Sequence, residues 1–188
     1  MTQRPPPEVT PAYLEILAVR ELRKAGLEVA DVRKQRRAEL PEPERGFLLE
    51  LQVWLSRAAW SKRALIACWR QDGGATIGRA AIDDLAQRLG SAQAVVGLVF
   101  ATAEFAPDAL ATAEEAGIAL FRLVDARTAF DTGGWGEPGH YPSWLPAYLV
   151  QLVDRDPSGG GQARYRLLEA GGAGLIIDRL ERKEAPHG

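Results

Sequence analysis

The chain has 188 residues, of which 46% are hydrophobic, and this combination fits one globular domain with a full core and excludes a disordered chain. The formal net charge of −2 excludes a global basic field, so any DNA binding requires a local patch. A single cysteine, Cys68, and two histidines, His140 and His187, exclude a disulfide framework and argue against structural zinc.

The first segment with a regular pattern is an amphipathic helix over residues 12–25. Leu14, Leu17 and Leu22 recur at the spacing of one helical face, and Gly26 follows where a C-terminal cap belongs. The proline-rich residues 1–11 predict an extended or disordered lead-in, because proline fixes φ and removes hydrogen-bond donors.

Three strands are predicted next. Residues 27–32 alternate apolar and polar side chains, whereas residues 33–46 are charged, contain two prolines and predict an exposed connection. Residues 46–55 and 62–70 predict two antiparallel neighbours that end at a turn signal. In the first of these, odd-numbered residues from Phe47 to Leu55 share an apolar face, and even-numbered residues share the other.

The middle of the chain predicts a β-α-β unit. A helix is expected over residues 76–89, with Thr76 as its cap. The apolar run 94–103 predicts a strand covered on both faces, and residues 107–116 a helix before a further strand over 118–124. Residues 12–127 are therefore expected to form one α/β domain.

The last part, residues 128–188, changes in character. A stretch rich in Gly, Pro and aromatic residues precedes a predicted hairpin over 148–154 and 163–169, which a short apolar turn and a charged tail follow. We expect this part to be an interface arm that packs against a second copy or another protein. The expected aromatic anchors are Trp135, Tyr141, Trp144 and Tyr148.

The order of elements and two local strings resemble the Mrr-like branch of the PD-(D/E)XK restriction endonuclease family. The strings are YLEILAVRELRKAGLEVADVRK, in which Glu15 takes the place of the family's first-helix glutamate, and AVVGLVFATAEFAPDALATAEEAGIALF. The resemblance covers about two thirds of the chain. It implies a restriction-endonuclease-like αβββαβ core, here followed by the C-terminal hairpin.

The resemblance also implies where a nuclease site would lie. In this family an acidic residue on the second strand and an (E/Q)-x-K pair on the third converge to bind Mg²⁺ and activate water. Here Ala67 and Trp69 stand at the pair, and Gln52 stands at the acid unless a shift of two residues puts Glu50 there. None of Gln52, Ala67 and Trp69 supplies the charge or the base that this chemistry requires. We therefore expect no metal or other cofactor.

The leading hypothesis is an inactive endonuclease-like module that binds DNA or a protein within a DNA-processing or defence assembly. For DNA, the expected phosphate contacts are a basic cluster in the predicted connection: Arg33, Lys34, Arg36 and Arg37. Trp54 and Trp69 either stack on a base or pack in the protein. Cys68 points away from Ala67 and Trp69 and is expected to be a buried, inert thiol.

Two other hypotheses stay open. One is an active metal-dependent DNA endonuclease with migrated carboxylates, in which Glu15, Glu50 and Asp72 hold Mg²⁺. The other is a structural module of a homo-oligomer. His140 lacks partners for a triad or a metal site. No secretion signal or membrane-spanning run is evident in the sequence, so we expect a cytoplasmic location and no membrane partner.

Overall fold

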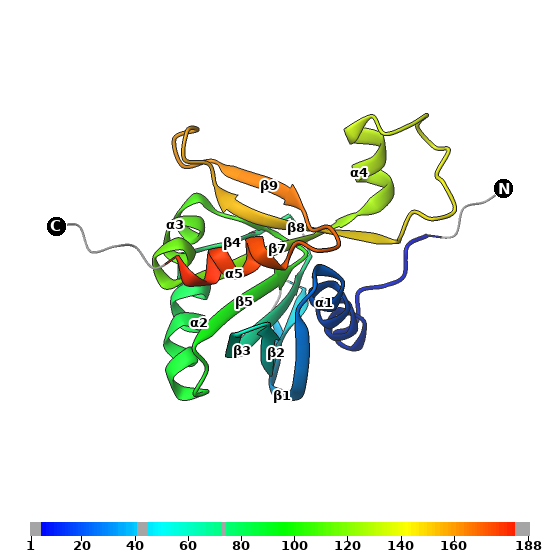
Figure 1. Cartoon of the computed structure of the whole chain (residues 1–188). Coiled ribbons are helices and arrows are strands. Elements are labelled where there is room, and N and C mark those ends of the chain that lie inside the picture. Colours follow the sequence, from blue (N-terminus) through cyan, green and yellow to red (C-terminus); the bar gives the residue numbers. More distant parts are fainter. Residues whose placement is uncertain (1–4, 41–44, 73, 183–188) are drawn as a thin grey trace.

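The computed structural model describes residues 5–40, 45–72 and 74–182, and a mixed sheet runs through its centre (Figure 1). The helices are α1 (Pro11–Ala25), α2 (Arg79–Ser91), α3 (Pro107–Ala116), α4 (Ala126–Gly133) and α5 (Ala173–Glu181). The longer strands are β1 (Glu28–Leu40), β2 (Gly46–Arg57), β3 (Trp60–Gln71), β5 (Val96–Ala101), β7 (Ile118–Asp125), β8 (Tyr148–Arg155) and β9 (Ala163–Leu167). Two short strands are β4 (Thr76–Ile77) and β6 (Glu104–Phe105).

The large sheet has seven strands in the order β1-β2-β3-β5-β7-β8-β9. Strands β1, β2 and β3 are antiparallel neighbours, β3, β5 and β7 run parallel, and β7, β8 and β9 are antiparallel again. The expected α/β class, the restriction-endonuclease-like αβββαβ order and the C-terminal hairpin are confirmed. The short strands β4 and β6 pair in parallel beside this sheet.

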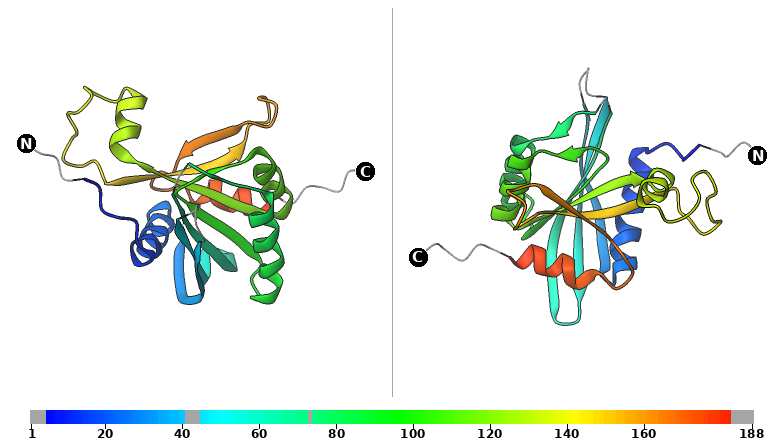
Figure 2. Two further views of the ribbon diagram at one scale, coloured as in Figure 1. Left: turned by 180° about the vertical axis from the view of Figure 1, so that it is seen from behind. Right: turned by 90° about the horizontal axis from the view of Figure 1, so that it is seen from above.

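Helices cover both faces of the sheet (Figure 2). On one face, α1 and α5 pack against the odd-numbered side chains of β2, and Leu14, Leu51 and Ile176 belong to that core. On the other face, α2 and α3 pack over Leu65 and Val99. Strand β5 is buried along its whole length, as its continuous apolar run predicted.

Local sequence signals explain several boundaries. The Thr10 hydroxyl accepts a hydrogen bond from the Tyr13 amide at the start of α1, and Gly26 ends that helix with a left-handed φ of 103°. Helix α3 begins with Pro107 and ends before Gly117, as predicted. At the start of β2, a Cβ on Gly46 would lie 1.9 Å from the Arg70 carbonyl oxygen, so only glycine fits this close hairpin.

Two expectations are corrected in the first half of the chain. The predicted connection after residue 32 continues as β1 to Leu40 and pairs with β2, although residues 41–44 lie outside the described part. This segment is an edge strand, and its exposed, charged side chains gave no strand pattern in the sequence. Thr76 belongs to β4, and α2 begins only at Arg79 with Gly78 as its N-cap. In the proline-rich lead-in, residues 5–10 form neither helix nor strand and Val9 is buried, whereas residues 1–4 lie outside the described part.

The hairpin does not form a separate arm. Strand β8 pairs with β7 and buries Val150, Leu152 and Val153 in the same chain, so the hairpin belongs to the central sheet. Its packing on a second copy or a partner stays a prediction. Residues 126–133 form helix α4, and the expected apolar turn near the end is helix α5. Helix α4 and the segment that follows it project away from the sheet (Figure 1).

Candidate functional site

The β2–β3 register decides which side chains meet where the family resemblance places a nuclease site. Glu50 lies directly opposite Ala67, and Leu48 lies opposite Trp69. Gln52 lies two pairs further along, opposite Leu65. Glu50, the alternative that a shift of two residues gives, is therefore the second-strand residue directly beside Ala67, and Gln52 lies on the same face next to it.

Glu50 is buried and fully engaged by an arginine from α2. Its side chain is only 2% exposed, whereas that of Arg88 is 32% exposed. The Arg88 Nε donates to both carboxylate oxygens of Glu50, at 2.7 and 3.0 Å, and Nη2 donates to Oε2. This bidentate hydrogen bonding raises the pKa of Arg88 above its usual value. The carboxylate charge at this point is thus neutralised within the protein.

Little space is left beside this ion pair. The cavity enclosed by Glu50, Ala67 and Trp69, together with the first turns of α2, holds about 10 Å³. That volume is at the lower limit for one water molecule. The Trp69 indole is half-buried, and its Nε1 has no hydrogen-bond partner within the described ranges. The indole therefore fills the space where a lysine would reach towards a substrate.

A family model described as "Restriction endonuclease" (Mrr_cat) matches residues 7–128, which make up most of the chain. The chain belongs to this family. No curated protein and no solved structure matches the chain. The restriction endonuclease match ends at the beginning of α4, so β8, β9 and α5 complete the sheet and its cover outside the matched region.

Restriction endonucleases of this type use a divalent metal, and the residues present here do not fit one. A hard cation needs several oxygen ligands, most of them charged. Of the three positions Glu50, Ala67 and Trp69, only Glu50 carries a carboxylate, and both of its oxygens already accept hydrogen bonds from Arg88. Over the described residues there is no group of three or more His, Cys, Asp or Glu side chains that could hold a metal ion.

The carboxylates considered for a migrated metal site do not converge. Glu15 lies on α1, on the opposite face of the sheet from Glu50, and its Oε2 lies 3.2 Å from Lys34 Nζ. Asp72 forms an ion pair with Arg70 at the far end of β3. Cys68 points towards α1, and burial, with a smaller contribution from Glu15, raises the pKa of its thiol. It is a buried core thiol, as expected.

The predicted basic cluster lies on a strand, where alternation divides it between the two faces of the sheet. Lys34 turns towards α1, and Arg37 lies on the same side and pairs with Glu39 at 3.1 Å. Arg36 lies 4.0 Å from both Glu50 and Asp84 on the other side. Only Arg33 has no hydrogen bond or ion pair within the described part of the chain.

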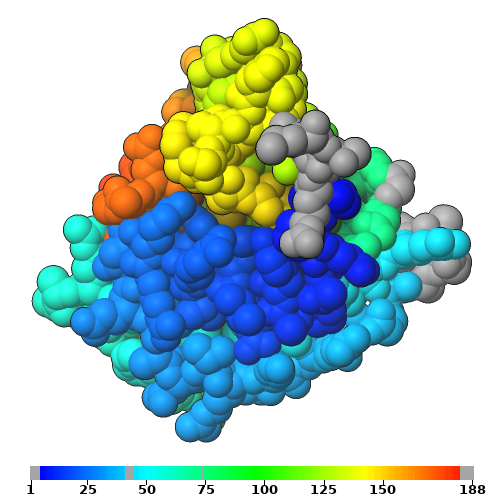
Figure 3. Space-filling view, turned by 90° about the vertical axis from the view of Figure 1, so that its right-hand side faces the viewer, coloured from blue at the N-terminus to red at the C-terminus, as the bar shows by residue number. Residues whose placement is uncertain are grey.

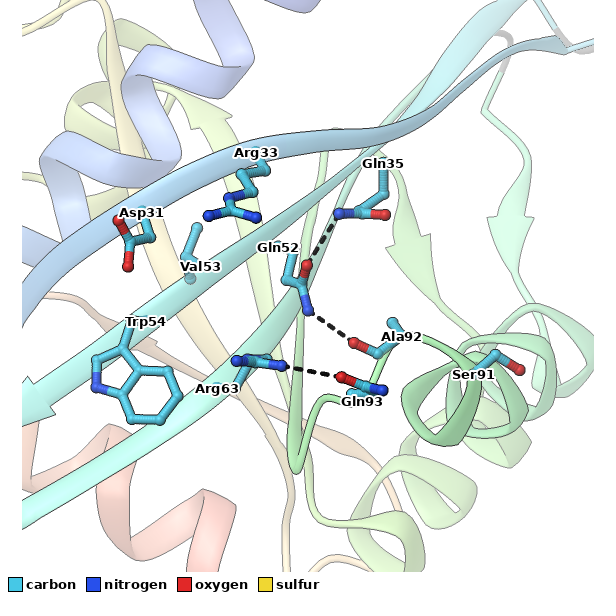
Figure 4. Close-up of a pocket in the computed structure, with 10 residues that line it drawn as sticks. All are labelled: Asp31, Arg33, Gln35, Gln52, Val53, Trp54, Arg63, Ser91, Ala92 and Gln93. Atoms are coloured by element: carbon cyan, nitrogen blue, oxygen red, sulfur yellow. Dashed lines mark hydrogen bonds between the residues drawn. The ribbon is translucent and has the colours of Figure 1, made fainter.

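The unengaged Arg33 lines a polar pocket next to the filled site (Figure 4). The pocket has a volume of about 340 Å³, which lies in the range of small-molecule sites. Gln52 connects its walls, because it accepts a hydrogen bond from Gln35 at 2.9 Å and donates one to the Ala92 carbonyl at 2.7 Å. Gln52 is therefore a positioning residue of this pocket.

The opposite wall of the pocket consists of the Arg63 guanidinium, which lies over the Trp54 indole. The Arg63 guanidinium lies 5.6 Å from the centre of the Trp54 ring and donates to Gln93 Oε1 at 3.3 Å. Trp54 is 39% exposed and lies directly opposite Arg63 in the β2–β3 register. An exposed indole held in this way offers a flat surface next to positive charge.

Sequence reasoning missed both arginines that define the two sites. The position of Arg63 opposite Trp54 follows from the β2–β3 register, in which the numbers of paired residues sum to 117. The sequence alone does not determine that register. Arg88 stands 38 positions after Glu50, and no spacing in the sequence signals that α2 brings it onto that carboxylate.

The aromatic residues predicted as an interface divide into two groups. The Tyr141 hydroxyl donates to Asp131 at 2.6 Å, and the Tyr148 hydroxyl donates to the Pro7 carbonyl at 2.7 Å, so both serve contacts within the chain. Trp135 and Trp144 are 51% and 72% exposed. They belong to the segment seen as a yellow projection in Figure 3. His140 is exposed beside Glu137, as a loop histidine.

One further finding concerns membranes. Within the described residues, none of the helices combines the length and the apolar character that crossing a bilayer requires.

Proposed function

We propose that this chain is a non-cleaving member of the restriction endonuclease family that binds nucleic acid through the face of the sheet carrying Arg33, Trp54 and Arg63. The observation that supports the loss of cleavage is the Arg88–Glu50 ion pair beside Ala67 and Trp69. Binding of nucleic acid by the same scaffold needs no metal, but only positively charged side chains on an accessible surface.

The chemistry of the filled site argues against hydrolysis. Activating a water molecule for attack on a phosphodiester needs a base or a metal that lowers the pKa of the water. An alanine methyl group and an indole supply neither, and Glu50 already accepts hydrogen bonds from Arg88. The positive charge of Arg88 also offsets the negative charge of Glu50, so this carboxylate does not repel a nearby phosphate backbone.

The neighbouring pocket supplies features that nucleic acid binding uses. Arg33 has no side-chain partner among the residues that the structure describes and can contact a phosphate, and Arg63 keeps donors near the pocket although it contacts Trp54 and Gln93. Arginine binds phosphate oxygens with a fork of parallel donors, and exposed aromatic rings stack on bases. The chain as a whole is slightly acidic, so this local group is what would attract a polyanion.

The experiment is a fluorescence anisotropy titration of the protein with labelled DNA at several salt concentrations. Arg33→Gln combined with Arg63→Gln should weaken binding and flatten its salt dependence, because each lost phosphate contact removes about 0.7 to 0.9 from the log–log slope. Arg37→Gln is the matched control, since Arg37 lies on the same strand but on the other face. Equal binding by all three proteins would overturn the proposed interface.

A second candidate function is protein binding, and the exposed aromatic segment favours it. Trp135 and Trp144 are the most exposed aromatic side chains in the described ranges, and such residues anchor protein interfaces. The partner would be a second copy or a component of a DNA-processing or defence assembly. Trp135→Ser with Trp144→Ser should then change the sedimentation of the protein or of its complex; unchanged sedimentation in both cases would exclude this role.

A further inference from the structure

We propose that the pocket lined by Asp31, Arg33, Trp54 and Arg63 takes a single unpaired nucleotide, with its base on Trp54 and its phosphate on Arg33. This inference deepens the proposed function and rests on it, because it names the class of ligand at the same face. The ligand chemistry is one flat ring joined to one anionic group. Its source is either a free nucleotide or a nucleotide within a single strand.

The shape of the pocket fits a ligand of this size. About 340 Å³ lies between side chains of β1 on one wall and of β2 and β3 on the other (Figure 4). Helix α2 ends at Ser91, so the residues after it form a third wall through Ala92 and Gln93. The pocket opens where the helix no longer covers the sheet. The filled space around Glu50, by contrast, lies beneath the helix.

The two ends of the pocket differ in chemistry. The Trp54 ring is 39% exposed, with a guanidinium at 5.6 Å from its centre, and such a ring gains from stacking against a second π-system. The base in a paired duplex is already stacked on both faces, so only an unpaired or extruded base can use this surface. Trp54 therefore favours single strands over duplexes.

Backbone irregularities direct the polar groups towards this pocket. Strand β1 has a bulge between Ala30 and Arg33, and Asp31 within it has a φ of 51°. Bulges of this kind redirect side chains. Gln93, which holds Arg63, also has a positive φ of 54°. Figure 4 shows Asp31, Arg33, Trp54 and Arg63 around the same hollow, with Gln52 across its far side.

The charges also narrow the ligand class. Two guanidinium groups and one carboxylate give the pocket a net positive charge of one. Arg33 has no hydrogen bond or ion pair within the described ranges, so its donors are available to a phosphate. The Asp31 carboxylate disfavours a polyphosphate but can accept hydrogen bonds from a base amino group or a sugar hydroxyl. A nucleoside monophosphate unit has all of these groups.

The test uses a labelled 12-nucleotide DNA single strand, its duplex and adenosine 5′-monophosphate, each titrated with the full chain. The single strand should bind tighter than the duplex. Trp54→Leu should weaken single-strand binding about tenfold, with little effect on the duplex. Trp54→Phe should keep most of the affinity. Arg33→Gln should lower the single-strand salt slope by about 0.7, and Arg37→Gln should leave it unchanged.

The outcomes separate this inference from the function on which it rests. Duplex affinity equal to single-strand affinity, with Trp54→Leu binding both like the wild type, would overturn the nucleotide pocket but leave the binding face intact. No binding of any probe would overturn both. Calorimetric binding of the monophosphate that Trp54→Leu removes would identify a free nucleotide as the ligand, whereas binding of the strand alone would identify a nucleotide within a chain.

Discussion

The site around Glu50 and the pocket around Trp54 lie on the same face of the same two strands, yet one is filled and the other is open. Glu50 faces Ala67, and Trp54 faces Arg63, only four pairs of the hairpin further along. The first space holds about 10 Å³ and the second about 340 Å³. The family scaffold is therefore preserved, and the open space on this face lies further along the hairpin.

Helix α2 explains the difference. Its buried side carries Ile82 and Leu85 over the filled site, and Arg88 closes the ion pair with Glu50. The helix ends at Ser91, so residues beyond Gln52 lose this cover. Under the helix, low solvent access requires that Glu50 be paired, because an unpaired buried carboxylate is unfavourable. Beyond the helix, Arg33 is exposed, and its side chain has no ion pair or hydrogen bond among the described residues.

The largest effect is expected from reopening the filled site. Ala67→Glu with Trp69→Lys and Arg88→Ala puts a second carboxylate directly opposite Glu50 and removes the competing guanidinium. The variant should bind Mn²⁺ with a dissociation constant of about 10⁻⁴ to 10⁻³ M, typical of weak carboxylate sites. Isothermal titration calorimetry measures this. Equal Mn²⁺ uptake after adding Glu50→Gln would show that the metal binds elsewhere.

Breaking the ion pair alone should reduce stability. Arg88→Met leaves the buried Glu50 carboxylate with only Arg36, 4.0 Å away, and should lower the free energy of unfolding by about 3 kcal/mol, the lower end for such pairs because Arg88 is one-third exposed. Urea denaturation measures the change. Arg79→Met, on the exposed side of the same helix, should cost no more than about 0.5 kcal/mol. Adding Glu50→Leu should restore most of the loss; no recovery would show that Arg88 acts through other contacts.

A smaller effect is expected for the wall between the two spaces. Gln52→Ala removes the hydrogen bonds with Gln35 and with the Ala92 carbonyl and should lower the free energy of unfolding by about 1 kcal/mol. Gln35→Ala keeps the hydrogen bond from Gln52 to the Ala92 carbonyl and should lower the free energy of unfolding by less. If thermal unfolding of the two variants is indistinguishable, Gln52 does not hold the end of α2 in place.

The smallest effect on stability should come from the open pocket itself. Trp54→Leu changes a side chain that is 39% exposed and should alter the free energy of unfolding by less than about 0.5 kcal/mol. Differential scanning calorimetry provides the measurement. A loss of more than 2 kcal/mol would mean that Trp54 is a packing residue, and that a binding defect in this variant reflects unfolding.

The fold was predictable where patterns were periodic. Helices α1 and α3, the β2–β3 hairpin and the buried strand β5 all followed from spacing and from glycine or proline at their ends. Strand β1 was missed beyond residue 32 because an edge strand can carry charged side chains on both faces, which removes the alternation. Helix α4 was missed because its eight residues lie at the start of a segment rich in Gly and Pro.

The site was only partly predictable. Alternation correctly put Glu50 and Gln52 on one face, but a shift of two residues keeps the face and changes the neighbour, so alternation could not choose between them. In the structure, the pairing register brings Glu50 directly opposite Ala67. The contact with Arg88 depends on how α2 crosses the sheet, and the open pocket depends on where α2 ends, neither of which the spacing of apolar residues determines.

The central claim is that the scaffold of a restriction endonuclease persists here without its chemistry, and a cleavage assay tests it most directly. The purified chain would be incubated with supercoiled plasmid DNA and Mg²⁺ or Mn²⁺, beside the Glu50→Ala variant prepared in the same way. We predict that both proteins leave the plasmid uncut, because Ala67, Trp69 and the paired Glu50 provide neither metal ligands nor a base. Metal-dependent cutting by the unmodified chain that Glu50→Ala abolishes would contradict the account.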